Sequence, residues 1–408
     1  MMHEANRTSR LGIDRSSLPL LLVLVDAFLW YYLTLNIMSN ISNTFQIDLL
    51  LLLPLHALGA VVSGILGVAF SRRRRRLLLL WTTLGAVTAL LPLLDTLHTL
   101  LGFQLICFAW GFSFGLGMPA CLSYFAENVA IERRGLFGGL VFLSSFFCAF
   151  VINGVTRPAS LQITYTSFGI LRLVGFIPLL TLHFEKKEAK PERDVRHYVS
   201  AIVHDRRIFM YLTPWFLFNV IDKVEELLLR SHVKNAFPQY SLTMQLMSLL
   251  FTGTFVFVGG IFCDLVGRKT VTILGFSVLG VAYAIISIVP NALGAWYFFF
   301  VINGLSWGLF YTIFVTLIWG DLAPKGLEEA YYYIGNIPLF LAAILQTFLA
   351  GPMTFLSETS AFSLAAFFLF IAVLPILFAP ETLPEKKIQE RQVRDYVEKA
   401  KKLRGKHV

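Results

Sequence analysis

Charged residues are scarce in this chain, because Asp, Glu, Lys and Arg make up only 14% of its 408 residues. Soluble domains usually carry about a quarter, so the deficit argues against a soluble protein. Cysteine is also rare, and the sequence contains only Cys107, Cys121, Cys148 and Cys263. Because these four lack the paired spacing of a disulfide framework or a zinc site, we expect free thiols and no bound metal.

Motifs that mark common enzyme classes are missing as well. The sequence contains no His-Glu-x-x-His helix of a metalloprotease and no Walker loop for ATP. We therefore predict that the chain is not an enzyme and needs no cofactor. An ATP-driven pump is excluded on the same ground, unless a separate subunit binds the ATP.

Long apolar runs dominate the sequence, since 56% of the residues are hydrophobic and the mean hydropathy is +0.70. Twelve runs approach the ~20 residues that cross a bilayer core. Lipid leaves no partner for unpaired backbone groups, so we expect these runs to be helical. The predicted fold is an all-α membrane protein with twelve transmembrane helices. They are expected over residues 18–37, 46–70, 77–95, 98–123, 136–156, 161–184, 207–230, 241–263, 270–290, 292–320, 331–351 and 359–379.

Basic residues are concentrated on alternate loops between these runs. One set of loops carries the arginine run 72–76, Arg133, Arg134, Arg268, Lys269 and the basic segment after residue 380, whereas the other carries only Arg157, Arg230 and Lys234. Cytoplasmic loops are the ones enriched in Lys and Arg, so we place the first set and both termini in the cytoplasm. This bias explains the net charge of +9, which is therefore no evidence for nucleic-acid binding. We predict a multi-pass protein of the plasma membrane with no nucleic-acid partner.

Two parts of the chain resemble each other at an offset of 193 to 198 residues. Residues 192–199 (ERDVRHYV) are similar to residues 390–397 (ERQVRDYV), and residues 110–116 are similar to residues 303–309. Such self-similarity is typical of transporters built from two related halves. We therefore predict two pseudo-symmetric six-helix bundles. The expected division is 1–184 and 207–380 for the bundles, 185–206 for a cytoplasmic linker with an amphipathic helix, and 381–408 for a basic cytoplasmic tail.

The segment Gly259-Gly260-Ile261-Phe262-Cys263-Asp264-Leu265-Val266-Gly267-Arg268-Lys269 ends the eighth run and begins the next loop. Its pattern, G-x-x-x-D-x-x-G-R-K in a predicted cytoplasmic loop, resembles the signature of the major facilitator superfamily. The resemblance implies the fold of that family. It also implies a conformational latch that holds the cytoplasmic side closed, formed by Gly260, Asp264, Gly267, Arg268 and Lys269. The counterpart in the first half is degenerate, because Val68 and Ser71 stand where the Asp and the second Gly would be.

Two further segments resemble the sugar-porter and organic-ion branches of this family, namely Ala379-Pro380-Glu381-Thr382-Leu383-Pro384 and Glu132-Arg133-Arg134-Gly135. Other features depart from the drug/proton antiporter branch. Cys107 stands where many proton-coupled members have an Arg, and residues 136–156 lack the Gly-Pro-rich motif of that branch. Coupling to protons is therefore left open.

Ionisable residues inside the predicted spans are candidates for substrate binding and proton coupling. A charge at mid-bilayer costs roughly 2.5–3.5 kcal/mol on insertion scales, so it normally faces a partner or a cavity. The candidates are Asp26, His56, Arg172 and Asp222. The resemblance implies that the first helix of each half lines a central cavity, so that Asp26 and Asp222 would face each other there. Asp26 is also a candidate partner for Arg172, and His56 has the alternative role of a hydrogen-bonded core residue.

Aromatic and amide residues supply the neutral part of the predicted site, which comprises Trp30, Asn303, Trp307, Tyr311 and Asn336. Trp307 and Tyr311 are four residues apart and would form a ring-stacking surface on one helix face. The run Tyr331 to Tyr333 opens the eleventh span, and we assign it to the aromatic belt at the membrane interface.

These features together predict a secondary active transporter that moves a small polar or amphipathic solute by rocker-switch alternating access. We expect a monomer in the lipid bilayer with a small-molecule substrate and, if transport is coupled, with protons as symported or antiported ions. Three alternatives stay open: an uncoupled facilitator, a lipid or amphiphile transporter, and a non-transporting receptor on the same fold. The sequence specifies neither the substrate nor the direction of transport.

Overall fold

The computed structural model describes residues 17–156, 160–182, 202–353 and 355–383, and these form helices and no strand. The α-helices are α1 (Leu18–Phe45), α2 (Leu53–Ala69), α3 (Arg74–Ala89), α4 (Leu100–Gly115), α5 (Met118–Asn128), α6 (Arg134–Thr156), α7 (Leu161–Val174), α8 (Phe176–Thr181), α10 (Arg206–Ala236), α11 (Ser241–Val266), α12 (Arg268–Ile288), α13 (Leu293–Phe310), α14 (Ile318–Leu322), α15 (Glu328–Met353) and α16 (Glu358–Phe378). A π-helical segment, Tyr311–Leu317, joins α13 to α14. Most of the predicted linker 185–206 and tail 381–408 lies outside the described residues.

Eleven helical segments in the described ranges are long and apolar enough to cross a membrane. Some consist of consecutive helices, so that α4 and α5 together run from Leu100 to Asn128. The remaining predicted span, 207–230, lies within α10. This helix has 31 residues and extends about 46 Å at ~1.5 Å per residue. Its charged residues, Asp222, Lys223, Glu225 and Glu226, set it apart from the other eleven.

Asp205 fixes the start of α10. Its carboxylate accepts a hydrogen bond from the backbone N–H of Arg207 (3.0 Å), as an N-cap residue does, and another from the Tyr331 hydroxyl (2.8 Å). Burial raises the pKa of this carboxyl, but the hydrogen bonds from Arg207 and Tyr331 outweigh it and leave the pKa below its ordinary value. Tyr331 thereby ties the start of α15 to the start of α10 instead of facing the membrane interface.

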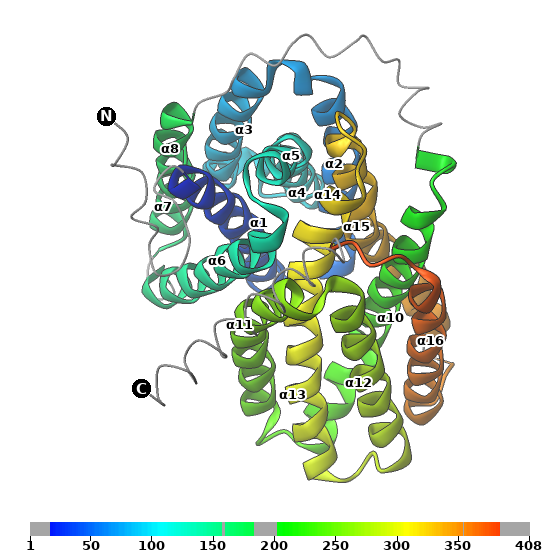
Figure 1. Ribbon diagram of the computed structural model, residues 1–408. Coiled ribbons are helices and arrows are strands. Elements are labelled where there is room, and N and C mark those ends of the chain that lie inside the picture. Colours follow the sequence, from blue (N-terminus) through cyan, green and yellow to red (C-terminus); the bar gives the residue numbers. More distant parts are fainter. Residues whose placement is uncertain (1–16, 157–159, 183–201, 354, 384–408) are drawn as a thin grey trace, which may run out of the picture.

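The helices are arranged in two groups (Figure 1). Helices α1 to α8 lie together as the first helix group, and α10 to α16 form the second helix group. The two groups meet where α6 packs against α11 and where α2 and α5 pack against α15. The site described below lies along this contact.

Glycines let the two groups approach closely where α6 meets α11. A Cβ atom on Gly135 would lie 2.2 Å from the carbonyl oxygen of Gly260, and a Cβ on Gly260 would lie 2.2 Å from that of Gly135. Both distances are far below a van der Waals contact, so only glycine fits at either position. The predicted latch residue Gly260 is therefore a packing residue between the groups.

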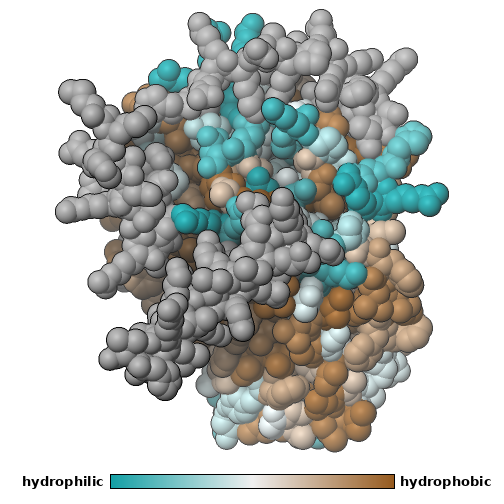
Figure 2. Space-filling view, in the orientation of Figure 1, coloured by the Kyte–Doolittle hydropathy of each residue, from teal (hydrophilic) through white to brown (hydrophobic). Residues whose placement is uncertain are grey.

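Large apolar side chains cover much of the outer surface. Figure 2 shows brown apolar residues over much of the lower half of the view, where α11 to α13 and α16 lie, while hydrophilic residues gather in its upper half. Both helix groups expose such side chains: Phe147 and Phe150 of α6 and Ile288 of α12 have exposed fractions of 66%, 66% and 78%. Apolar exposure on this scale is expected of a surface that faces lipid.

Candidate functional site

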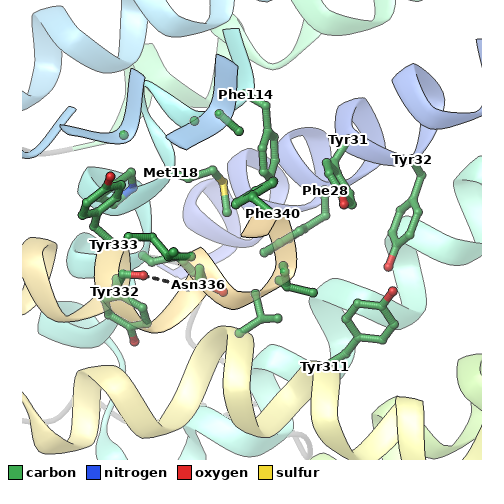
Figure 3. A pocket seen from close by; sticks show the side chains of 18 of the residues that line it. Phe28, Tyr31, Tyr32, Phe114, Met118, Tyr311, Tyr332, Tyr333, Asn336 and Phe340 are labelled. Atoms are coloured by element: carbon green, nitrogen blue, oxygen red, sulfur yellow. Dashed lines mark hydrogen bonds between the residues drawn. The ribbon is translucent and has the colours of Figure 1, made fainter. Parts of the chain in front are cut away.

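A cavity lies between the two helix groups (Figure 3). Its volume is about 60 Å³, enough for a few water-sized molecules. The lining residues come from α1, α2, α4 to α6, the π-helical segment and α15. They are Phe28, Tyr31, Tyr32, Ala60, Gly64, Phe114, Gly115, Met118, Pro119, Leu122, Phe142, Tyr311, Val315, Tyr332, Tyr333, Asn336, Ile337, Leu339 and Phe340.

Aromatic rings form most of the cavity wall. Tyr31 packs against Phe114 with ring centroids 4.7 Å apart, and Tyr32 faces Tyr311 at 6.4 Å. In Figure 3 the hydroxyls of Tyr32 and Tyr311 point toward each other at one side of the cavity. One of these residues comes from each helix group, so the pair spans the contact between the groups.

Tyr332 and Tyr333 line the cavity and are held in place by their hydroxyls. Tyr332 donates a hydrogen bond to the carbonyl oxygen of Thr316 (2.7 Å), and Tyr333 donates one to that of Val61 in the other helix group (3.0 Å). The assignment of these tyrosines to an interfacial belt is therefore wrong. Sequence position near a helix start could not distinguish a belt residue from one that faces a cavity.

Asn336 is the amide in the lining. Its Nδ2 donates a hydrogen bond to the carbonyl oxygen of Tyr332 (2.9 Å). Its Oδ1 is buried and has no hydrogen-bond partner among the described residues. Buried polar atoms are rarely left unpaired, and this acceptor belongs to a residue that lines the cavity.

The predicted ionisable residues Asp26, His56, Arg172 and Asp222 are not among the residues that line this cavity. Asp26 forms an ion pair with Arg172 inside the first helix group. The Arg172 guanidinium also lies over the Trp81 ring, 4.3 Å from its centroid. The pairing of Asp26 with Arg172 matches one predicted alternative. Asp26 is on the opposite face of α1 from Phe28, Tyr31 and Tyr32, because helix periodicity places those three on one side.

His56 and Trp30 are buried in the first helix group. His56 Nε2 lies 3.4 Å from the Thr34 hydroxyl, and its ring centroid is 5.9 Å from that of Tyr31, just behind the cavity wall. Trp30 donates a hydrogen bond to the Ser113 hydroxyl (3.1 Å). Both side chains support the wall and do not line the cavity.

Asp222 and Trp307 meet in the second helix group, where the Trp307 Nε1–H donates to the Asp222 carboxylate (2.9 Å). Trp307 also packs on Tyr311 with centroids 4.9 Å apart, as their spacing predicts. Lys223 lies 2.8 Å from Glu226 and 3.8 Å from Asp222. These residues form a charged cluster behind Tyr311, with two carboxylates around one ammonium.

Asn303 lies away from that cluster. Its Nδ2 donates a hydrogen bond to the Ser248 hydroxyl (3.4 Å), which joins α13 to α11. Of all the predicted substrate residues, Tyr311 and Asn336 alone appear in the cavity lining.

Asp264 bridges the two helix groups at the end of the molecule that carries Arg74, Arg134 and Arg268, hereafter the basic end. Its two carboxylate oxygens accept hydrogen bonds from the backbone N–H groups of Gly135 (3.0 Å) and Leu136 (2.8 Å), at the start of α6. A helix N-terminus favours negative charge because its first N–H groups are unpaired and its dipole is positive there.

Arg268 extends this bridge through a fully buried side chain. Its guanidinium lies 3.2 Å from Asp264 and 3.1 Å from Asp321, and it donates a hydrogen bond to the carbonyl oxygen of Ile131 (2.6 Å). Asp321 is also paired with Arg134 of the first helix group (2.6 Å). The sequence motif identified Asp264 and Arg268, but it did not predict their distant partners at the start of α6 and in α14.

Gly267 and Lys269 shape the turn between α11 and α12. Gly267 has a φ of +108°, which a side chain would strain. The Glu381 carboxylate accepts hydrogen bonds from the backbone N–H groups of Arg268 (2.8 Å) and Lys269 (3.1 Å). The Lys269 ammonium donates to the carbonyl oxygen of Leu377 (2.7 Å). The contacts of Glu381 and Lys269 hold the turn against the end of α16.

Arg74 forms a second bridge at the basic end. It pairs with Glu127 of its own helix group (2.8 Å) and with Glu329 at the start of α15 (2.6 Å). The sequence analysis missed this contact, since Arg74 stands in a run of five arginines and its partner is 255 residues away. The degenerate motif before it contains no acidic residue that would have pointed to a bridge.

Two segments have the Gly-x-Ser-x-Gly spacing of a hydrolase nucleophile elbow, at 111–115 and 304–308. Both lie within helices, whereas that motif needs a strand-to-helix turn. The Ser113 hydroxyl donates to the carbonyl oxygen of Trp110 (2.8 Å), and that of Ser306 donates to Gly275 (3.2 Å). The glycines serve packing: a Cβ on Gly111 would lie 1.8 Å from the carbonyl oxygen of His56.

Neither a protein-family model nor a curated protein matches the chain by sequence. Several solved structures share its architecture. The human organic anion transporter MFSD10 has a TM-score of 0.69 at 12% identity, with 88% of this chain and 98% of that chain covered. The proton:xylose symporter XylE, a major facilitator superfamily protein, gives 0.67 at 15% identity, with coverages of 90% and 96%. A bacterial homologue of the iron transporter ferroportin, in an outward-facing state, gives 0.66 at 14% identity, with coverages of 89% and 98%.

At these identities the likeness concerns the arrangement of the helices. It agrees with the loop motif around Asp264 and with the eleven membrane-length helices. The chain therefore has the fold of the major facilitator superfamily.

Proposed function

We propose that this chain is a secondary transporter that works by alternating access, and that the structure represents the state closed at the basic end. The proposal follows from a cavity enclosed between two helix groups and from polar contacts that join the groups at one end. The charge bias of the loops assigns that end to the cytoplasm. The cavity would then open to the opposite side, and α10 would serve as the seventh of twelve spans.

The observation that carries the proposal is the set of three bridges at the basic end. Asp264 accepts hydrogen bonds from the start of α6, Asp321 pairs with Arg134, and Arg74 pairs with Glu329. Each bridge joins one residue of the first helix group to one of the second. Ionic and helix-terminus contacts can break when water enters, so they suit an interface that must open and close better than a continuous apolar core does.

The bridges are related by the internal repeat. Arg74 and Arg268 differ by 194 positions, and so do their carboxylate partners Glu127 and Asp321. The same offset relates Gly135, whose backbone N–H donates to Asp264, to Glu329, which forms an ion pair with Arg74. This common offset, two residues shorter than the one that relates Val68 to Asp264, supports two related halves that meet at the basic end.

A cysteine reporter inside the cavity tests this function. Leu122 lines the cavity on the side of the basic end, and Leu122→Cys can be labelled in vesicles with a membrane-impermeant maleimide applied to the cytoplasmic face. The double variant Asp264→Asn/Arg74→Gln replaces one acceptor carboxylate by an amide and removes one cation, which weakens two bridges. We expect it to raise the cytoplasmic labelling rate at least tenfold.

The matched control is Arg207→Gln, which removes a charge at the same end but breaks an ion pair with Asp205 inside the second helix group. The parent chain without the reporter measures labelling of the native cysteines. Equal labelling rates in the double variant and the control would contradict the transporter and favour a receptor with a fixed cavity.

A further inference from the structure

We propose that the cavity binds a neutral, ring-shaped solute that donates one hydrogen bond to Asn336 Oδ1. This inference rests on the proposed transport function and specifies its substrate class. It is carried by the charge of the lining, the arrangement of the rings and the unpaired acceptor.

The cavity lining that the structure describes contains no formally charged side chain. Among the described residues that line the cavity, none is an Asp, Glu, Lys, Arg or His. The nearby Lys223, Asp222 and Glu226 lie outside the lining, where Lys223 pairs with Glu226 at 2.8 Å. An ion in this cavity would lose its water without gaining a counter-charge, which is strongly unfavourable. A neutral solute avoids that cost.

The walls present ring faces at fixed positions. The tyrosines 332 and 333 are anchored by their hydroxyls to backbone carbonyls of neighbouring helices, so their rings cannot turn away. Phe114 lies 4.7 Å from Tyr31 and 6.2 Å from Phe340, centroid to centroid. Aromatic rings pair favourably at about 4.5–7 Å in offset or edge-to-face geometry. A flat ring between these walls would make such contacts on several sides.

Asn336 defines the polar contact. Its amide orientation is set by the hydrogen bond to Tyr332, because a carbonyl oxygen there requires the NH₂ side of the amide. The other side, Oδ1, is therefore an acceptor, and it has no partner among the described residues. A site with a buried acceptor favours solutes that bring an N–H or O–H and disfavours analogues that lack one.

The cavity must widen to admit such a ring. A volume of about 60 Å³ is well below the roughly 300–1,000 Å³ of a typical ligand cleft. Met118 and Phe340 project into the space (Figure 3), and methionine adapts readily to a new shape. We infer that the ring enters when the groups separate at the end opposite the bridges, and that the walls close around it.

Two isomeric probes separate the hydrogen bond from size and apolarity. 3-Methylindole keeps the ring N–H, whereas 1-methylindole carries the same methyl group on that nitrogen and donates nothing. Binding to the full-length protein in nanodiscs can be measured by titration of the thermal midpoint, with empty nanodiscs correcting for partition into lipid. We expect 3-methylindole to bind at least tenfold more tightly.

The variant Asn336→Leu should remove this difference, so that both isomers bind equally. Indole-3-acetate, an anion of similar size, should bind at least tenfold more weakly than 3-methylindole. Equal binding of the two isomers to the unmodified protein would overturn the hydrogen bond to Asn336, whether or not the variant folds. If indole-3-acetate bound more tightly than 3-methylindole, the solute would not need to be neutral. If a long-chain alcohol bound more tightly than 3-methylindole, a lipid-like substrate would be favoured.

This experiment can fail separately from the proposed function. If neither isomer binds but the Leu122→Cys reporter still responds to the bridge variants, the substrate class is wrong and alternating access stands. If the reporter does not respond, the transport proposal fails regardless of the probes.

Discussion

Arg172 is fully buried, and Asp26 is its ion-pair partner in the first helix group. Two glycines make room for the pair: a Cβ on Gly85 would lie 2.7 Å from Arg172 Nε, and one on Gly175 would lie 2.1 Å from Asp26 Oδ2. The Nε and Nη2 atoms of Arg172 have no hydrogen-bond partner among the described residues. The buried guanidinium is therefore stabilised mainly by Asp26 and by the Trp81 ring.

Replacing Asp26 by Asn should strongly destabilise the protein. Removing one partner of a buried pair leaves the other charge uncompensated, which costs about 3–5 kcal/mol. The double variant Asp26→Asn/Arg172→Met removes both charges and should recover most of that loss. Thermal unfolding in detergent measures the effect, and equal destabilisation by the single and double variants would show that the charge pairing is not responsible.

At this scale the sequence predicted chemistry better than location. It named Asp26 as a candidate partner for Arg172, because a buried guanidinium needs an opposite charge or a polar cluster. It did not predict that the pair lies within one helix group, since the helix face that meets the partner group depends on packing. Tyr332 and Tyr333 were misplaced for the same reason.

At the scale of elements, the contact between α6 and α11 combines a glycine pair with a charged helix terminus. Gly135 takes part in both, because its backbone N–H donates to Asp264 and its Cα faces Gly260. Close approach of the two helices and capping by Asp264 therefore depend on each other. Any residue that separates the helices should also break the hydrogen bonds.

The substitution Gly260→Ala tests this dependence. The added methyl would lie 2.2 Å from the carbonyl oxygen of Gly135, so α6 and α11 must move apart. We expect faster cytoplasmic labelling of Leu122→Cys, in the same direction as Asp264→Asn. The control is Gly253→Ala on α11, where a Cβ would meet nothing within 4 Å. If both alanines behaved alike, close helix packing would play no part in closing the basic end.

The sequence motif predicted the contacts at the basic end well for residues of the second half and poorly for residues of the first half. Gly260, Asp264 and Arg268 are close in sequence, so their spacing alone indicated a joint role. Arg74 and Glu329 are far apart in the chain, and only the fold brings them together. A long-range ion pair of this kind leaves no local pattern that a single sequence could reveal.

At the scale of the whole molecule, two helix groups enclose an uncharged cavity and are bridged by charges at the basic end. Hydropathy predicted the membrane-length helices, of which eleven are found in the described ranges, because hydropathy is a pattern along the sequence. The position of the cavity depends on how the two groups face each other, and no local pattern encodes that. The central claim is that the groups move relative to each other, opening one end as the other closes.

Paired spin labels test this claim most directly. One pair replaces Arg75 and Lys325, exposed residues near the Arg74–Glu329 bridge, and the other replaces Asp95 and Phe355, which lie at the opposite end. Electron–electron distances are compared between the unmodified protein and Asp264→Asn/Arg74→Gln in nanodiscs. Alternating access predicts that the 75–325 distance lengthens while the 95–355 distance shortens. Unchanged distances at both ends, or lengthening at both, would contradict it.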